Sequence, residues 1–297
     1  MNGTGRYAPS PTGELHLGNL RTALLAWLSA RSTESDFLLR IEDLDSGRSR
    51  SQWIAVQLRE LEMLGIDWDG EALQQSDRSG HYEDAVKCLE SEGLLYECFC
   101  TRAEIREAAS APHGEFPEGA YPGTCASLSP TERKDMRASG RPPALRVRAG
   151  GSILAFEDGF RGKVTGEIDD FVVRRNDGDY AYNLAVTVDD AEQGIGEVVR
   201  GADLLVTTPR QLWLFEKLGL QAPSSYIHVP LMLGEDGARL AKRHGAVTME
   251  ERIAEGATVG GLVGEMAASV GLCDPGDSVE ARELIDGFTW EAVTAIT

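Results

Sequence analysis

Short apolar segments alternate with longer segments of helical periodicity along the first part of the chain. A short strand is expected at residues 4–8, and residues 37–41 are apolar and short enough for a second one, with a helix between them at residues 17–30. Apolar side chains recur at the spacing of one helix face over residues 49–64, and a second helical stretch follows at residues 81–92. Strands that alternate with helices favour the α/β class, in which helices cover a parallel sheet.

The pattern changes at residue 98 and changes back near residue 141. Cysteines, prolines, glycines and polar turns fill this stretch, which is typical of an insertion on the crossover of an α/β domain. Strand signals then return at five places, namely residues 144–147, 153–156, 164–168, 170–174 and 184–188. Helices are expected at residues 212–218, 259–270 and 279–284.

These patterns divide the chain into four parts. We expect the first half of an α/β domain at residues 1–97, a small inserted lobe at 98–141, the second half of the domain at 142–245 and a helical C-terminal region at 246–297. A length of 297 residues agrees with one large domain or two ordinary ones, at roughly 150 residues per domain. The composition, 42% hydrophobic and 26% charged, is that of a globular protein.

No apolar run approaches the roughly 18 to 20 residues of a membrane-spanning helix, and the N-terminus lacks the basic-then-apolar order of a signal peptide. We therefore expect a cytoplasmic protein without a membrane partner. The net charge of −19 argues against a partner held by charge alone, because nucleic-acid binding normally relies on a basic surface. RNA is not excluded, because local basic pairs remain, such as Arg146 with Arg148 and Arg174 with Arg175.

The first candidate site is segment 6–19, which places a polar, glycine-containing turn between the first strand and the first helix. Backbone N–H groups and the positive end of a helix attract anions, and glycine lets a nucleotide approach closely, so this turn suits phosphate. His16 could donate to a phosphoryl oxygen. The alternative is an ordinary loop in which Thr12 or Asn19 caps the helix.

The second candidate site is a short basic run between glycines at residues 237–245. Arg239, Lys242 and Arg243 could neutralise the charge that develops as pyrophosphate leaves a triphosphate. The alternative is a solvated basic turn, since most charge clusters lie on the surface.

Together, the two sites resemble the signatures of a class I aminoacyl-tRNA synthetase of the glutamyl type. Residues 16–19 stand where that family has its HIGH signature, and residues 239–243 stand in place of its KMSKS loop. Five further segments resemble the family in the same order: residues 40–45, 182–185, 188–190, 199–204 and 226–231. The resemblance implies a Rossmann-like catalytic domain with a parallel sheet, a small zinc-binding insertion and a short helical C-terminal region.

The resemblance also implies a role for each site residue. Glu42 faces the substrate ammonium, Arg6 and Arg200 face its carboxylates, and Tyr182 donates a hydrogen bond. The arginine fork suits a planar carboxylate. The rest of the glutamate-binding stretch is Tyr7, Ala8, Pro9 and Ser10, and the ATP-binding residues are His16, Gly18, Asn19 and Lys242, with His16 and Lys242 as the catalytic pair and Mg²⁺ bound with ATP.

Each of these residues also has a purely structural alternative. Glu42 could pair with Arg40, Tyr182 could be a core aromatic, and Arg200 could form a surface salt bridge. The sequence also departs from the family signatures. Arg239 and Ala241 replace the first lysine and the serine of the Lys loop, and Asn19 replaces the second histidine of the other signature.

Three of the five cysteines, Cys98, Cys100 and Cys125, lie in the inserted lobe. Grouped thiolates in a chain without an export signal favour a tetrahedral structural zinc site over disulfides, with one Zn²⁺ per chain. Chemistry alone favours His113 as the fourth ligand, because imidazole is a common zinc ligand, whereas the family resemblance favours Tyr121. The alternative is three unliganded thiols in a loop.

Only residues 246–297 follow the Lys loop, whereas glutamyl-tRNA synthetases continue into a long anticodon-binding region. We therefore expect no anticodon-binding domain. This short architecture is similar to the glutamyl-Q tRNA(Asp) synthetases, which activate glutamate with ATP and attach it to the queuosine base of the tRNA(Asp) anticodon. The expected partners are ATP, L-glutamate and queuosine-containing tRNA(Asp), and the expected state is a monomer.

Two alternatives remain open. The first is a truncated ligase that transfers glutamate to a tRNA 3′ end or to a small amine. The second is a catalytically idle zinc-containing RNA-binding paralogue. Retention of the five predicted site residues His16, Glu42, Tyr182, Arg200 and Lys242 argues against an idle protein.

Overall fold

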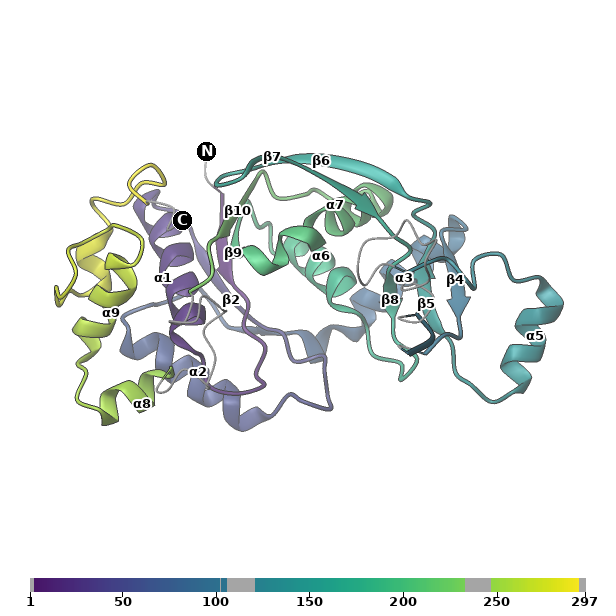
Figure 1. Cartoon of the computed structure of the whole chain (residues 1–297), viewed down its shortest axis with the longest axis horizontal. Coiled ribbons are helices and arrows are strands. Elements are labelled where there is room, and N and C mark those ends of the chain that lie inside the picture. Colours follow the sequence, from purple (N-terminus) through teal and green to yellow (C-terminus); the bar gives the residue numbers. More distant parts are fainter. Residues whose placement is uncertain (1–2, 102, 106–120, 233–246, 294–297) are drawn as a thin grey trace.

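The computed structural model describes residues 3–101, 103–105, 121–232 and 247–293. Lys242 with the rest of the predicted Lys loop, and His113, lie outside the described residues. The molecule is elongated, with helices α8 (Met249–Ala254) and α9 (Val259–Ala268) at one end and α5 (Pro130–Ala138) at the other (Figure 1).

The N-terminal half supplies one side of a parallel sheet. Strand β1 (Gly5–Tyr7) pairs with β2 (Phe37–Ile41), and β2 pairs with β3 (Leu73–Gln74). Helix α1 (Leu17–Ser32) connects β1 to β2, and its leucine-rich sequence is buried on nearly every side. Helix α2 (Ser51–Met63) connects β2 to β3.

The second half supplies the other side of the sheet. Strands β9 (Glu197–Gly201) and β10 (Ser225–Val229) are parallel along their whole length. Strand β6 (Ser152–Asp158) joins β10 at Tyr226 and forms a long hairpin with β7 (Gly162–Ile168). This hairpin runs along the upper edge of Figure 1.

Two glycines bring the halves together. The Gly196 N–H donates to the Thr4 carbonyl (2.9 Å), which places β9 beside β1. A Cβ on Gly196 would lie 2.5 Å from the Gly3 Cα, so both positions require glycine. The first strand therefore has β2 on one side and β9 on the other. Such a switch point opens a crevice at the carboxyl ends of the strands.

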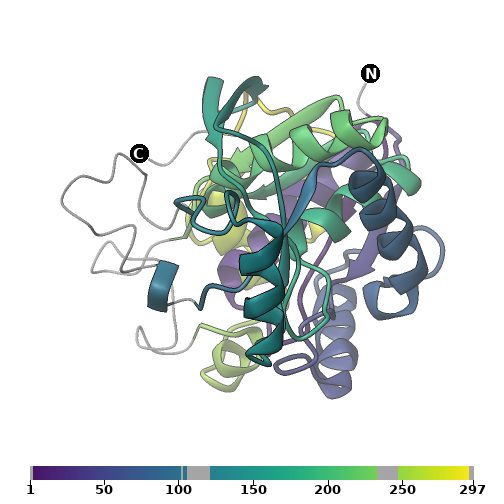
Figure 2. The same ribbon diagram turned by 90° about the vertical axis from the view of Figure 1, so that its right-hand side faces the viewer.

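Helix α6 (Tyr182–Glu192) leads into β9. The 3₁₀ turn η2 (Ala202–Thr207) and helix α7 (Thr208–Leu218) then connect β9 to β10. A separate antiparallel sheet consists of β4 (Leu95–Cys98), β5 (Ala144–Val147) and β8 (Val172–Arg174), preceded by helix α3 (Ser79–Ser91). Figure 2 shows this end of the molecule facing the viewer, with α5 in front.

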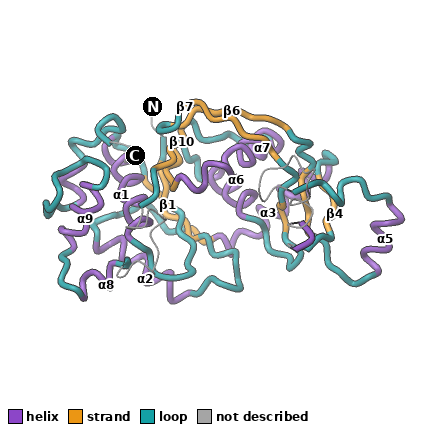
Figure 3. Tube along the Cα trace, viewed as in Figure 1, coloured by secondary structure: helices purple, strands orange, loops and turns teal. Residues whose placement is uncertain are grey.

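The C-terminal helices pack on α1 and share its core (Figure 3). Arg21 of α1 donates to the Ser269 hydroxyl (3.1 Å), and the Trp290 indole N–H donates to the Ser29 hydroxyl (2.9 Å). The short turn η4 (Ala281–Leu284) also packs there. Within the described parts of the chain, no helix has both the length and the apolar character to cross a membrane.

The structure confirms the α/β class with a parallel sheet and corrects one element. Residues 184–188, expected to be a strand, lie in helix α6. The run looks like a buried strand because the helix is buried from Leu184 to Asp190 and so lacks a polar face. The prediction also missed β9 and β10, because buried polar or charged side chains (Glu197 and Arg200 in β9, His228 in β10) interrupt their apolar pattern.

Candidate active site

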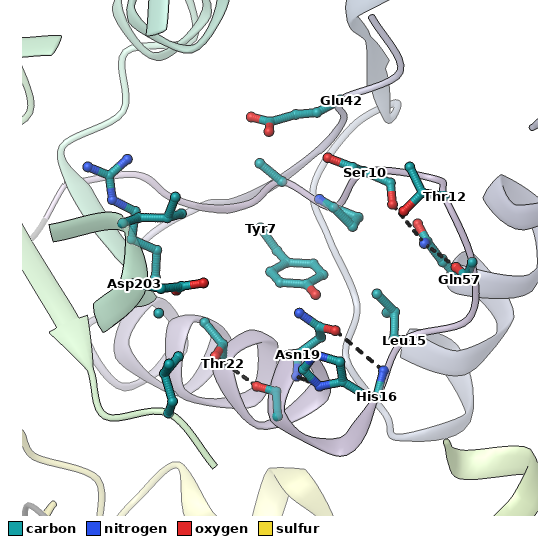
Figure 4. A pocket seen from close by; sticks show the side chains of 18 of the residues that line it. Tyr7, Ser10, Thr12, Leu15, His16, Asn19, Thr22, Glu42, Gln57 and Asp203 are labelled. Atoms are coloured by element: carbon teal, nitrogen blue, oxygen red, sulfur yellow. Dashed lines mark hydrogen bonds between the residues drawn. The ribbon is translucent and has the colours of Figure 1, made fainter. Parts of the chain in front are cut away.

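A cavity of about 720 Å³ lies at the carboxyl ends of the parallel strands and the start of α1. Figure 4 shows Glu42 at one end of it, His16 and Asn19 at the other, and the Tyr7 ring between them. All the described residues predicted to bind glutamate or ATP line this one cavity: Arg6, Tyr7, Ala8, Pro9, Ser10, His16, Gly18, Asn19, Glu42, Tyr182 and Arg200. Their individual roles stay predictions.

His16 is the N-cap of α1. Its Nδ1 accepts a hydrogen bond from the Asn19 N–H (3.1 Å), and the Asn19 side-chain oxygen accepts one from the His16 N–H (3.4 Å). Because Nδ1 is an acceptor, the neutral ring carries its hydrogen on Nε2. A Cβ on Gly18 would lie 3.1 Å from the His16 ring, so glycine lets the ring lie over the first helical turn.

Helix α2 holds the turn that precedes α1. The Gln57 amide donates to the carbonyls of Ser10 (3.1 Å) and Gly13 (2.7 Å), and a Glu60 oxygen accepts from the Leu15 N–H (3.2 Å). Burial raises the pKa of Glu60 to about 7, although the bond from Leu15 opposes the rise. The backbone that faces the cavity is thereby fixed from behind.

The described residues on both sides of segment 233–246 lie beside this turn. Met232 lines the cavity. On the far side, the Leu17 N–H donates to the Val247 carbonyl (2.9 Å), and Thr248 forms a β-bridge with His16. The segment that contains Lys242 therefore leaves and rejoins the described chain next to the start of α1.

Buried charges cluster at the other end of the cavity. Arg40 donates to Asp190 (2.7 Å) and to Glu42 (3.3 Å), and the Arg6 Nε lies 3.4 Å from Asp190. Burial alone would raise the pKa of Asp190, but Arg40 and Arg6 hold it below the ordinary value. Asp190 is therefore a charged partner for both arginines.

Burial raises the pKa of Glu42 and outweighs the opposite effect of Arg40 and Arg6. The structural alternative, a pairing of Glu42 with Arg40, is present, and Glu42 also lines the cavity. A substrate ammonium there would stabilise the charged carboxylate.

Arg200 is buried, at 4% exposure, and its partners are neutral. It donates to the His228 imidazole (3.0 Å), the Thr208 hydroxyl (2.8 Å) and the Tyr182 phenol (3.3 Å). Among the described residues, no carboxylate forms a salt bridge with it. A buried cation without a carboxylate partner favours an anionic ligand.

The inserted lobe brings together the predicted metal ligands. The sulfurs of Cys98, Cys100 and Cys125 lie within 4.8 Å of one another. The Tyr121 hydroxyl oxygen lies 3.4 Å from the Cys98 sulfur and 3.6 Å from the Cys100 sulfur, and the Arg146 guanidinium stacks 3.7 Å from the Tyr121 ring centroid. Three thiols and a phenol oxygen thus converge on one point, a donor set that could bind a metal ion.

The expected basic patches are engaged within the protein. Arg146 and Arg148 lie over the rings of Tyr121 and Tyr96, while Arg174 and Arg175 pair with nearby acidic residues.

Further cavity residues escaped the sequence analysis: Thr22, Gln57, Asp203, Leu231 and Met232. Asp203 belongs to segment 199–204, which resembles the family, so this resemblance could have identified Asp203 as a site residue. A Cβ on Gly201 would lie 2.6 Å from an Asp203 carboxylate oxygen, so glycine makes room for this side chain.

The sheet, its switch point and the charged crevice define a Rossmann-like class I synthetase catalytic domain. Residues 4–260 match the family described as tRNA synthetases class I (E and Q), catalytic domain. The chain is 54% identical to a Glutamyl-Q tRNA(Asp) synthetase of Nocardia farcinica over 92% of its own length and 86% of the relative's, and 48% identical to one of Symbiobacterium thermophilum over 96% and 91%. The chain belongs to the class I tRNA synthetases of the E and Q group and, within that group, to the family of the glutamyl-Q tRNA(Asp) synthetases.

Longer relatives overlap only in part. A Glutamate–tRNA ligase of Aquifex aeolicus is 41% identical over 84% of this chain, which spans 54% of that relative. The crystal structure of a glutamate tRNA ligase from Elizabethkingia meningosepticum in complex with its amino acid superposes with a TM-score of 0.84 at 28% identity, over 99% of this chain and 66% of that one.

Proposed function

We propose that the protein activates L-glutamate with ATP to give glutamyl adenylate and then transfers glutamate to the queuosine base in the anticodon of tRNA(Asp). The observation that carries the choice of amino acid is Arg200, a buried cation with neutral partners that opens onto the cavity. The choice of acceptor rests on the relatives named for it, which the chain spans almost completely.

The amino acid is bound by charge at three points. Glu42 receives the ammonium group, and Arg6 and Arg200 receive the carboxylates. Asp190 already occupies one edge of Arg6, so Arg200 has the larger uncompensated charge. Tyr182 accepts from Arg200, which leaves its own O–H to donate to the substrate.

Adenylation needs no nucleophile from the enzyme. An oxygen of the α-carboxylate attacks the α-phosphorus of ATP, the bond from that phosphorus to the bridging oxygen breaks, and pyrophosphate leaves. Positioning and charge neutralisation lower the barrier. The His16 Nε2–H and the positive end of the α1 dipole serve the phosphates, and Lys242 neutralises the leaving pyrophosphate. Mg²⁺ bound with ATP would supply further positive charge there.

In the second step a hydroxyl oxygen of the queuosine base attacks the carbonyl carbon of the adenylate. The bond between that carbon and the phosphate oxygen breaks, AMP leaves with the bonding electrons, and the hydroxyl proton is released.

A structural Zn²⁺, one per chain, would be held by Cys98, Cys100, Tyr121 and Cys125. Bound there, it would order the lobe and supply no reacting group. We further propose a cytoplasmic monomer. Its RNA affinity is expected to be modest, because few cations remain to contact phosphates, and to fall with salt in proportion to the number of those contacts.

The test is glutamate-dependent ATP–pyrophosphate exchange without RNA, followed by transfer of radiolabelled glutamate to tRNA(Asp) with and without queuosine. Exchange with transfer only to the queuosine-containing tRNA is the expected result. Exchange without transfer to either tRNA would keep the ligase and move the acceptor to a tRNA 3′ end or a small amine. No exchange with any amino acid would favour the idle paralogue.

A further inference from the structure

A row of three polar side chains crosses the parallel sheet behind the amino-acid end of the cavity. Arg200 of β9 and His228 of β10 are direct register partners, and Asp158 at the end of β6 is paired with Tyr226 of β10. All three side chains of the row are buried. Burial of polar and charged groups is costly without hydrogen bonds, so the partners of these three side chains have to be identified.

The direction of the hydrogen bonds follows from the donors. The Arg200 Nε can only donate, and it lies 3.0 Å from the His228 Nε2, so Nε2 is an acceptor. The hydrogen of the neutral ring is then on Nδ1, which donates to an Asp158 oxygen at 2.6 Å. Asp158 thereby fixes the tautomer of His228, and His228 fixes the guanidinium plane of Arg200.

Asp158 is itself anchored by the backbone. One oxygen accepts from the N–H groups of Phe160 (3.1 Å) and Arg161 (3.0 Å) at the tip of the β6–β7 hairpin, and the other accepts from the His228 N–H (3.1 Å). Burial would raise the pKa of Asp158, but these bonds and His228 hold it below the ordinary value. The row therefore ends in a charged, immobile carboxylate.

The surroundings of the ring keep it neutral. Asp158 and the Phe156 ring face it from β6, Arg200 from β9, Thr208 from the start of α7 and, at longer range, Arg6 from β1. Burial and the nearby arginines lower the pKa of His228 and outweigh Asp158.

We propose that His228, held by Asp158, is the positioning residue that presents Arg200 to the side-chain carboxylate of the substrate, and that a neutral imidazole at this place makes the pocket select an acid over its amide. This inference rests on the proposed function. A carboxylate in the same place would hold the guanidinium equally well but would compensate its charge, as Asp190 does for Arg6. A neutral holder leaves the charge for the ligand.

The first test compares His228→Phe, which removes the acceptor, with His228→Gln, which can supply one. In glutamate-dependent pyrophosphate exchange, H228F should raise KM for glutamate roughly 10- to 100-fold, the effect of losing one hydrogen bond to a charged group. The KM for ATP should not change, the preference for glutamate over glutamine should fall, and H228Q should restore much of both glutamate properties. The matched controls are H81F and H81Q, since His81 is exposed and paired with Glu192 outside the cavity.

An H228F enzyme with wild-type KM and wild-type preference for glutamate would overturn the proposal. So would equal rises in KM for glutamate and ATP, because these would indicate a general structural loss.

The second test uses the wild-type protein and needs neither activity nor a folded H228F. Nitrogen-15 NMR of the imidazole groups, assigned by comparison with H228Q, should show His228 as the neutral Nδ1–H tautomer from pH 6 to 8. An imidazolium or an Nε2–H tautomer of His228 would overturn the proposed hydrogen bonds from Arg200 to His228 and from His228 to Asp158. Absence of glutamate-dependent exchange in a wild-type protein with the expected tautomer would instead contradict the proposed function and refute the selectivity claim, while supporting the Arg200–His228–Asp158 geometry.

Discussion

Individual side chains in the cavity differ in whether their chemistry is set by sequence neighbours or by distant residues. His16 is oriented by Asn19, three positions away, and a cap at this spacing can be predicted from the sequence. Arg200 is oriented by His228, which comes from another strand. Both cavity residues could therefore be predicted from the sequence, whereas the residue that holds Arg200 could not.

Lys242 gives the first prediction at this scale. Lys242→Ala should lower the rate of adenylate formation on the order of 100-fold or more, because a cation that neutralises the leaving pyrophosphate acts mainly in the transition state. Glutamate binding in the absence of ATP should stay unchanged. Pyrophosphate exchange and equilibrium binding measure the two effects, with Lys87→Ala as the control, since Lys87 is exposed and pairs with Asp84. Near-normal exchange in K242A would refute the role.

Glu60 gives the second prediction. Its pKa of about 7 in the folded protein lies above the ordinary 4.5, so between these values the folded chain retains a proton that the unfolded chain has lost. The contribution of Glu60 to stability is therefore complete below about pH 4.5 and declines as pH rises towards 7. Urea unfolding at several pH values should show a smaller decline for Glu60→Gln. Parallel stability profiles for the two proteins would contradict this explanation.

At the scale of elements, the start of α1 combines a structural and a ligand-binding role. Asn19→Ala removes the oxygen that accepts from the His16 N–H, a long bond of 3.4 Å. We expect the free energy of unfolding to fall by about 0.5 kcal/mol, the low end for a helix cap. Chemical denaturation of the ligand-free protein measures this.

Asn19→Asp is the matched variant. It keeps the capping oxygen and adds a negative charge at the positive end of the helix, so stability should be retained. The same charge faces the ATP phosphates, so KM for ATP should rise. If N19A has wild-type stability, Asn19 has no capping role in the free protein.

Most elements could be predicted from the sequence, because amphipathic helices such as α2 and short apolar strands such as β2 have distinctive periods. Three of the failures share a feature, the lack of a regular alternation of apolar and polar positions. Helix α6 is buried from Leu184 to Asp190, and β9 and β10 carry buried polar side chains, among them Arg200 and His228. Burial, and the polar residues of the site, thus hid the local pattern of these elements.

For the molecule as a whole, the inserted lobe should be separable from adenylation. Cys125→Ser should lose the bound zinc and lower the thermal midpoint, because a closed metal site contributes directly to folding. Pyrophosphate exchange should persist, since the cysteine cluster contributes no residue to the cavity among the described positions. Zinc content by elemental analysis is the decisive readout, and Cys88→Ser is the control, because Cys88 is exposed. Full zinc occupancy in C125S would exclude the predicted ligand set.

The position of β1 beside β9 also determines when the pocket can form during synthesis. Arg6 reaches the Val199 carbonyl across 193 positions of sequence. A ribosome adds about 5 to 20 residues per second, so the open edge of β1 waits roughly 10 to 40 s for its neighbour. Until then the nascent chain exposes an unpaired strand edge that other chains could capture, and a chain cut short before β10 lacks His228, the partner of the Arg200 Nε.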